Sequence, residues 1–550
     1  MSEKDLQKEI MDLKAQIKKL QKNNLGLVFE DKLEDVVTDC QQNIPVLKEV
    51  KAKRIISDEQ NPNNLLIEGD NYHSLSVLNY THKKNIDLIY IDPPYNTGNK
   101  DFVYNDDYVD KEDGYRHSKW LSFMRKRLEL ARELLKPSGA IFISIDDNEQ
   151  AHLRILCDRV FGETNFVANV IWQKKYTQSN DAKYFSTTHD FILCYANDIR
   201  QFNINLLTRT EDQISRYSNP DNDSRGPWAS QPIQVKTPSK AGIYEIVTPV
   251  GKKFNPPRGR SWQFSKGRYT ELVDDNRIWF GENGQNVPRI KKFLSEVKEG
   301  VIPKTVWLYN EVGSNDDAKR LLKEIVPERS FDSPKPVSLI AHIINLTCDK
   351  NATIMDFMAG SGTTGHAVMS LNSQDSGLRR FILCANNRDG NGDHRIMSEI
   401  CYPRLERVIK GYKNTKGEKV AGLGGNLSYY QTDLVNIEKI HKIPDEAKIR
   451  VTYQAGEMIA VREDTLNEVE KNEWWQIFEG KGRMTAIYFK EDKSKLGELI
   501  EKLEKKNIFV ALYIFSWGKN EYKGEYSSVN IRVEDIPEPI LEVYKEINRL

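Results

Sequence analysis

Two short motifs combine residue types that can do chemistry, and the first is Asp92-Pro93-Pro94-Tyr95, directly after the apolar run IDLIYI (86–91). Asp92 supplies a hydrogen-bond acceptor, the prolines hold a rigid turn with a carbonyl pointing outward, and Tyr95 supplies a flat face. This set suits a planar substrate with an exocyclic amino group, because two acceptors take its two N–H bonds while its ring stacks on the tyrosine. A nitrogen held in this way can face an electrophile, which is catalysis by positioning and electrostatics. Taken alone, the four residues are better read as a strand-ending turn.

The second motif lies between a predicted strand and a predicted helix. It reads Asp356-Phe357-Met358-Ala359-Gly360-Ser361-Gly362-Thr363-Thr364. Its glycines permit a tight turn and a close backbone approach to a ligand, and the helix that follows adds N–H donors. The motif matches neither a Walker A loop nor the full GxGxxG spacing of dinucleotide folds. A glycine turn of this kind is a weak signal by itself.

The elements around both motifs predict an α/β fold. Nearly continuous apolar runs predict buried strands at 65–70, 86–92, 140–146 and 379–386. Residues 116–135 predict a helix with one apolar face, formed by Trp120, Met124, Leu128, Ala131 and Leu135. This alternation predicts a mostly parallel, doubly wound sheet with helices on both faces. Ligands of such sheets bind at the carboxyl ends of the strands, where both motifs fall.

Composition excludes several classes of protein. The 550 residues carry 80 Lys+Arg and 80 Asp+Glu, so a uniformly basic nucleic-acid coat is excluded but a local basic patch is not. Six cysteines without a CxxC pair predict no metal site and no disulfide scaffold, in keeping with a reducing cytoplasm. No apolar run approaches about 18 residues, so no membrane span is expected. The charged start MSEKDLQKEI argues against a secretory signal.

Together the two motifs closely resemble the S-adenosylmethionine-dependent amino-methyltransferases of DNA. Their order, with DPPY first, resembles the circularly permuted beta subgroup. The resemblance covers about 45–205 and 330–412 and includes LIEGDN (66–71) and FDSPKP (331–336). The whole chain resembles the modification subunit of a type III restriction–modification system.

The resemblance implies a Rossmann-like methyltransferase in several parts. The catalytic domain would occupy 45–205 and 331–412, and a target-recognition domain would occupy 206–330. Residues 415–550 would form an α/β domain for dimerisation or partner docking. Residues 1–30 predict a short helix, read either as a coiled coil or as a surface helix, with the seam Leu6, Ile10, Leu13, Ile17 and Leu20.

The resemblance also implies roles for individual residues. Asp92 and the carbonyl of Pro93 or Pro94 would hold the target amino group, with Tyr95 stacked on the base. S-adenosylmethionine would contact Asp70 through its adenine and Lys335 through its carboxylate. Its methionine part would lie along Asp356, Phe357, Ala359, Gly360, Ser361, Gly362, Thr363 and Thr364.

Two assignments stay open. The strand after the glycine helix should end near an acidic residue for the ribose, but it ends in Ala385-Asn386-Asn387, so either Asn386 substitutes or Asp389 reaches back. Tyr184 or Phe185 would form the other face of the base pocket, or else belong to the core.

The segment 231–270 predicts DNA contact. It holds eight basic residues against Glu245 alone, with aromatic residues between them. The candidates for contacts to DNA are Lys252, Lys253, Arg258, Arg260, Lys266 and Arg268, of which Arg258 and Arg260 could read guanine edges. The alternative is a solvated charged face.

The expected activity is therefore adenine-N6 methylation of duplex DNA, on a base that has left the helix. The expected partners are DNA, a second copy in a homodimer, and a restriction subunit with helicase and nuclease functions. Cytosine-N4 methylation is the alternative reaction, although in the resembled family an Asp at the head of the motif goes mostly with adenine. A non-catalytic DNA-specificity subunit is the alternative class, and the intact DPPY and glycine turn argue against it. RNA or protein substrates stay open.

Overall fold

The computed structural model describes residues 30–58, 61–99, 101–387, 395–518, 521–522, 525–526 and 528–548. The predicted helix at 1–30 lies outside the described residues except for Glu30, and so does its whole apolar seam. The chain forms two compact units, one of Met1–Ile204 with Lys304–Leu550 and one of Asn205–Pro303.

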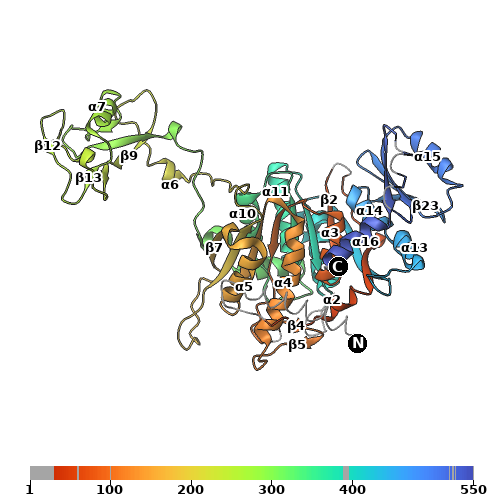
Figure 1. Cartoon of the computed structure of the whole chain (residues 1–550). Coiled ribbons are helices and arrows are strands. Elements are labelled where there is room, and N and C mark those ends of the chain that lie inside the picture. The colour runs from red at the N-terminus through yellow and green to blue at the C-terminus, as the bar shows by residue number, and fades with distance from the viewer. Residues whose placement is uncertain are drawn as a thin grey trace, which may run out of the picture. The chain divides into compact units, whose positions relative to one another are not determined.

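A ten-stranded sheet organises the first unit (Figure 1). Its strands in spatial order are β1 (Asn43–Glu49), β21 (Asn426–Asn436), β2 (Asn63–Glu68), β18 (Arg380–Ala385), β17 (Thr353–Asp356), β3 (Ile86–Ile91), β6 (Leu135–Ile145), β8 (His189–Ala196), β7 (Phe166–Gln173) and β16 (Val306–Trp307). The six strands from β21 to β6 run parallel, and β1 and β8 are antiparallel to their neighbours. The predicted α/β fold with a mostly parallel sheet is confirmed.

Helices cover both faces of this sheet (Figure 1). One face carries α3 (Asn71–Thr81), α4 (Arg116–Leu134), α5 (Gln150–Cys157), α14 (Gly456–Glu463) and α16 (Glu538–Ile547), and the other carries α10 (Val337–Thr347), α11 (Thr363–Asp375) and α12 (Tyr402–Lys410). The predicted helix at 116–135 is α4, and the four residues predicted on its apolar face within these bounds are buried. Smaller elements of this unit are α2 (Asp35–Asp39), β4 (Val103–Tyr104), β5 (Asp107–Tyr108), α8 (Tyr309–Val312), α9 (Asn315–Ile325), β19 (Gly411–Lys413), β20 (Lys419–Ala421) and α13 (Asp445–Gln454).

Two expected domain boundaries differ from the structure. The recognition domain was expected to run to residue 330, but the compact second unit ends at Pro303. After it, β16 pairs with β7 in the main sheet, and the indole of Trp172 donates to the carbonyl of Gly313, so this stretch is held by the first unit. The C-terminal domain was expected to begin at 415, but β21 lies inside the main sheet between β1 and β2.

A separate five-stranded sheet follows β21 within the first unit. Its strands in order are β22 (Asn467–Lys471), β23 (Trp475–Gly480), β24 (Arg483–Tyr488), β25 (Phe509–Phe515) and β26 (Ile531–Ile536). Helix α15 (Leu496–Glu504) connects β24 to its parallel neighbour β25, and its buried leucines belong to the core of this sheet. Strand β24, helix α15 and strand β25 thus form one β-α-β unit.

The second unit is small and built from short strands. They are β9 (Trp228–Pro232), β10 (Gln234–Val235), β11 (Ile246–Val247), β12 (Lys253–Phe254), β13 (Ser261–Trp262), β14 (Ile278–Trp279) and β15 (Arg289–Phe293), with helices α6 (Glu211–Ile214) and α7 (Lys266–Asp274). Trp262, Ile233 and Ile246 are fully or almost fully buried in its core.

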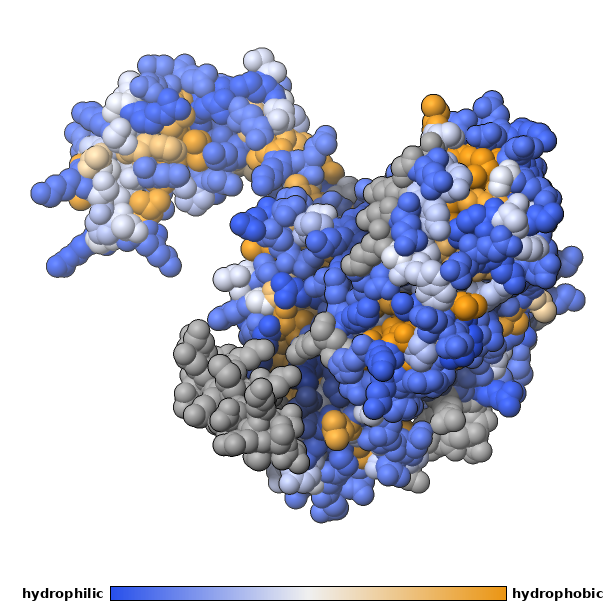
Figure 2. Space-filling view, turned by 45° about the vertical axis from the view of Figure 1, so that its right-hand side comes forward, coloured by the Kyte–Doolittle hydropathy of each residue, from blue (hydrophilic) through white to orange (hydrophobic). Residues whose placement is uncertain are grey.

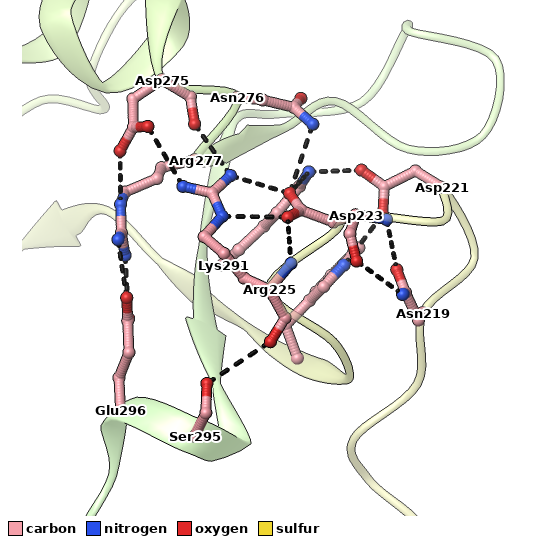
Figure 3. A network of polar contacts seen from close by, with 11 residues as sticks. Asn219, Asp221, Asp223, Arg225, Asp275, Asn276, Arg277, Lys291, Ser295 and Glu296 are labelled. Carbon is pink, nitrogen blue, oxygen red and sulfur yellow. Dashed lines mark hydrogen bonds and ion pairs between the residues drawn. The ribbon is translucent and has the colours of Figure 1, made fainter.

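A network of ion pairs ties the loops of this unit together (Figure 3). The ammonium of Lys291 is fully buried on β15 and pairs with Asp221 and Asp223. Arg225 joins Asp223 to Asp275, which follows α7. A buried charge without such partners costs several kcal/mol, so the network fixes the loop at 219–225 against β15 and α7.

The face of the protein in Figure 2 is mostly hydrophilic, with hydrophobic residues in separate patches. Among the described residues, no helix combines the length and the apolar character that a membrane crossing requires.

Candidate active site

The two motifs meet at one edge of the main sheet. Strand β17 pairs with β3 in parallel, with Ile354 opposite Leu88 and Met355 opposite Ile89. Asp356 ends β17 and Asp92 follows β3, so both motifs begin at the carboxyl ends of neighbouring strands. The sheet therefore brings together two segments that lie far apart in the sequence.

Asp92 has one engaged and one free carboxylate oxygen. Lys335, 7% exposed, donates from Nζ to Asp92 Oδ2 over 2.6 Å. Asp92 Oδ1 is buried and has no hydrogen-bond partner among the described residues. A buried acceptor without a donor is costly, so this oxygen fits a ligand that brings an N–H group. Lys335 is thus in contact with the catalytic candidate, whereas the sequence assigned it to the cofactor carboxylate.

The indole of Trp120 narrows the choice between the two proline carbonyls. Trp120 is fully buried on α4, and its Nε1 donates to the carbonyl oxygen of Pro94 over 2.7 Å. The Pro94 carbonyl therefore already has a donor, which favours Pro93 as the second acceptor for a bound amino group.

Tyr95 is held from its hydroxyl end. The hydroxyl donates to Asp190 Oδ2 over 3.4 Å, and Asp190 is buried on β8 and paired with Lys174. Burial, with the nearby carboxylates of Asp92 and Asp190, raises the pKa of Tyr95 well above its usual value, so the phenol stays neutral. A neutral ring anchored at one end presents a fixed stacking surface.

The second motif forms a tight turn around the carboxylate of Asp356. Oδ1 accepts from the backbone N–H of Met358 over 3.0 Å, and Oδ2 accepts from Thr364 Oγ1 over 2.6 Å. Burial raises the pKa of Asp356 to about 7, although these hydrogen bonds act in the opposite direction. Gly362 has φ +78°, and a Cβ there would lie 2.9 Å from Cys401 Sγ, so the turn requires glycine.

A buried arginine that sequence reasoning missed supports the turn. Arg404 on α12 donates to Ser361 Oγ over 3.0 Å and to Thr363 Oγ1 over 2.8 Å. Burial lowers the pKa of Arg404 to about 10. The only available signal was an arginine on the apolar face of the sequence YPRLERVIK (402–410).

A further part of the site lies at the carboxyl ends of β2 and β18, beside the two motifs. Asp70 caps α3 by accepting from the N–H of Tyr72 over 2.7 Å, and Arg127 lies 3.3 Å from the same oxygen. Asn386 is exposed after β18, and Asp389 lies outside the described residues. Glu68, which sequence reasoning missed, ends β2 beside β18 and accepts from Asn387 Nδ2 over 3.0 Å. The carboxylate of Glu68 therefore lies at these strand ends, where an acidic residue was expected for the ribose.

Tyr184 and Phe185 lie on the loop between β7 and β8. Their side chains are 81% and 93% exposed, so the alternative that they belong to the core is wrong. Their role in the base pocket stays a prediction.

In the second unit, all six predicted DNA-binding side chains are exposed. Two have acidic partners: Lys253 pairs with Glu245 at 2.9 Å, and Arg268 pairs with Glu271 at 2.5 Å. Lys252, Arg258, Arg260 and Lys266 have no ion-pair partner among the described residues within 4 Å. These four side chains therefore carry positive charges that no acidic side chain among the described residues neutralises.

Comparison with known proteins decides the family. The model of the DNA methylase family matches residues 86–389, more than half of the chain and inclusive of both motifs. The chain belongs to this family. The chain is 37% identical over 385 residues to the type III restriction-modification enzyme StyLTI Mod subunit of Salmonella typhimurium, a match that covers 64% of this chain and 58% of that protein.

A second relative is matched over a larger share of its length. The chain is 31% identical over 447 residues to the type III restriction-modification enzyme EcoPI Mod subunit of Escherichia phage P1, and the match covers 70% of this chain and 68% of that protein. A solved DNA modification methylase from Thermus thermophilus, complexed with S-adenosyl-L-methionine, is 13% identical and covers 59% of this chain and 89% of that chain. Its TM-score of 0.28 is too low to support an argument.

Proposed function

We propose that the methylase transfers a methyl group from S-adenosylmethionine to the N6 amino group of an adenine flipped out of duplex DNA. The observation that carries this proposal is the free, buried Oδ1 of Asp92 beside the glycine turn on the neighbouring strand. One motif offers an acceptor for an amino group, and the other offers a ligand cradle at the same edge of the sheet.

The residues present fit S-adenosylmethionine. The turn from Asp356 to Thr364 would hold its methionine part, with N–H donors at the start of α11, and Asp70 would lie toward its adenine. The bound cofactor supplies an electrophilic methyl group. Asp92 Oδ1 and the Pro93 carbonyl would accept the two N–H bonds of the target, which holds the nitrogen toward that methyl group.

Protein contacts would compensate for removing the base from the helix. Flipping costs a few kcal/mol of unstacking and unpairing. Tyr95 offers one anchored stacking surface, and exposed Tyr184 or Phe185 would offer a second. The four uncompensated basic side chains of the second unit would contact phosphates, each with a salt-dependent contribution.

Asp92 at the head of the motif supports adenine over cytosine, as the resemblance implies. The Mod-subunit relatives support a role as the modification subunit of a type III restriction–modification system. As the family resemblance implies, the chain would act as a homodimer and would associate with a restriction subunit in the cytoplasm.

Asp92→Ala tests the proposal. Tritium transfer from S-adenosylmethionine to DNA should fall by about 10²–10³, the usual cost of one positioned polar partner, while cofactor affinity changes by no more than a few fold. Asp87→Ala is the matched control, because Asp87 lies at the opposite end of the same strand and pairs with Lys136. Mass spectrometry of the nucleosides separates N6-methyladenine from N4-methylcytosine. Near-normal transfer by Asp92→Ala would contradict the proposal.

A further inference from the structure

A buried carboxylate lies beside the Asp92–Tyr95 motif and has no role in the proposed chemistry. Glu149 precedes α5, and its side chain is fully buried. Oε1 accepts from Asn96 Nδ2 over 2.5 Å and lies 2.6 Å from His117 Nδ1. Oε2 lies 2.9 Å from His152 Nδ1. No lysine or arginine among the described residues forms an ion pair with it.

The partners of Glu149 lead directly to the catalytic motif. Asn96 follows Tyr95, is fully buried, and has φ +57°, a left-handed conformation that few residues other than glycine and asparagine adopt. Among the described residues, its amide Nδ2 donates hydrogen bonds to Glu149 and, over 3.3 Å, to the carbonyl of Arg116. Glu149 and the first residue of α4 therefore hold the side chain of the residue that follows Tyr95.

Helix α4 connects to the motif at two points. His117, in its first turn, contacts Glu149, and Trp120, one turn later, donates to the Pro94 carbonyl. Glu149 thus joins the start of α4, the start of α5 and the residue after Tyr95. A displacement of any of these would move the two acceptors of the proposed site.

We infer that Glu149 is a positioning residue for methyl transfer: by accepting from Asn96 and His117 it holds the Asp92–Tyr95 turn in its reactive orientation. This inference rests on the proposed function. It adds a residue that touches neither substrate nor cofactor.

A bound metal ion is the competing explanation, because His117, Glu149 and His152 offer ligand atoms within 4.8 Å of one another. The hydrogen bonds argue against it. Arg116 Nε donates to His117 Nε2 over 3.3 Å, so Nε2 is the acceptor, and Nδ1 carries the proton that is donated to Glu149. In this tautomer a metal ion could bind His117 Nδ1 only by displacing its proton and the contact with Glu149.

Burial raises the pKa of Glu149 to about 7, opposed by the Asn96 amide, His152 and Arg116. Burial and Arg116 lower the pKa of His117, which keeps that imidazole neutral. Asn96 Nδ2 only donates, so a proton on Glu149 would occupy Oε2, on the side of His152. The contact between Glu149 Oε1 and Asn96 is compatible with both protonation states.

Two substitutions of Glu149 separate positioning from stability. Glu149→Gln keeps an Oε1 acceptor for Asn96 and His117, so kcat should stay within a few fold of the wild type. Glu149→Leu has a similar size but no acceptor, and kcat should fall about 10²-fold, as expected for a small misplacement of reacting groups. The Kd for S-adenosylmethionine, measured by calorimetry, should change by no more than a few fold.

Glu463 provides the matched control. Its buried carboxylate accepts from Tyr513 and Arg532 at 2.6 Å each, on an element unrelated to the motif. Glu463→Leu should lower the melting temperature without changing kcat at temperatures well below melting. Asn96→Gly supplies an independent variant if Glu149→Leu does not fold: glycine tolerates the left-handed backbone, and the loss of the Glu149 contact should again lower kcat.

Hydrogen–deuterium exchange gives a readout that does not require activity. Peptides spanning 92–98 should exchange faster in Glu149→Leu than in Glu463→Leu. If the wild type transfers no methyl group but this difference is seen, the proposed function fails and the positioning contact stands. Equal kcat in the two leucine variants, or equal exchange, overturns the inference. Stoichiometric binding of Zn²⁺ that is lost in His152→Ala also overturns it, in favour of a metal site.

Discussion

Replacing Lys335 by methionine separates two roles for this residue. The structure places its ammonium 2.6 Å from Asp92 Oδ2, in a nearly buried position. The family resemblance places the same ammonium near the carboxylate of the cofactor. Methionine keeps most of the length and volume of the side chain but removes the charge and the donors.

The expected magnitude follows from the Asp92 contact. A hydrogen bond to a charged group contributes about 1.5–3 kcal/mol, and each 1.36 kcal/mol in barrier height is a factor of ten in rate. If Lys335 orients Asp92, Lys335→Met should lower kcat by about 10- to 10²-fold. The Kd for S-adenosylmethionine should then change by no more than a few fold.

The assay combines single-turnover methyl transfer with calorimetric titration of S-adenosylmethionine. Lys335→Arg retains the charge and should recover part of the lost rate. Lys136→Met is the matched control. Lys136 pairs at 2.7 Å with Asp87, which lies at the start of β3, whereas Asp92 follows the end of that strand. It should leave both kcat and cofactor affinity close to wild type.

The opposite pattern would refute this reasoning. If Lys335→Met weakens cofactor binding strongly while kcat at saturating cofactor is unchanged, then Lys335 serves the cofactor carboxylate, and its pairing with Asp92 has no part in catalysis.

Two further predictions concern DNA affinity and pH. Replacing Lys252, Arg258, Arg260 and Lys266 by alanine should flatten the slope of log K for duplex DNA against log salt by up to about 3.6, at about 0.9 for each phosphate contact; filter binding across a salt series measures it, and an unchanged slope would mean that these residues do not contact DNA. Burial raises the pKa of Asp356 to about 7, so the folded protein holds a proton that the unfolded chain releases near pH 4. The contribution of Asp356 to the free energy of unfolding should therefore fall as pH rises from about 4 to 7, by up to about 1.4 kcal/mol per pH unit. Urea unfolding of the wild type and Asp356→Asn over this range tests the sign, and identical pH profiles would show that Asp356 is not the group involved.

The sequence predicted the parts of the fold that depend on local pattern. The run IDLIYI is apolar at nearly every position because β3 is covered on both faces, and this alone indicated a central parallel strand. The proximity of the two motifs followed from a general rule for strand ends. It required no knowledge of side-chain contacts.

The sequence did not predict contacts between distant segments. Lys335 and Asp92 are 243 positions apart, and no periodicity relates them. Trp120 was recognised as part of an apolar face. The hydrogen bond from its indole to the Pro94 carbonyl was not predicted, because it depends on how α4 packs beside the motif. Strand β21 was assigned to a separate domain because its place between β1 and β2 depends on pairing across most of the chain.

The order of strands in the main sheet has a consequence for synthesis of the protein. Strand β3 can pair with β6 soon after both strands leave the ribosome. Its other neighbour, β17, is translated only after the whole of Asn205–Pro303. Until then the backbone N–H and C=O groups along one edge of β3 have no strand partner, and such edges are prone to wrong pairing. The second unit is a continuous stretch of chain and can fold in that interval. We therefore expect the nascent chain to depend on chaperones before residue 353 emerges, and the site to form only after the turn at 356–364 has been translated.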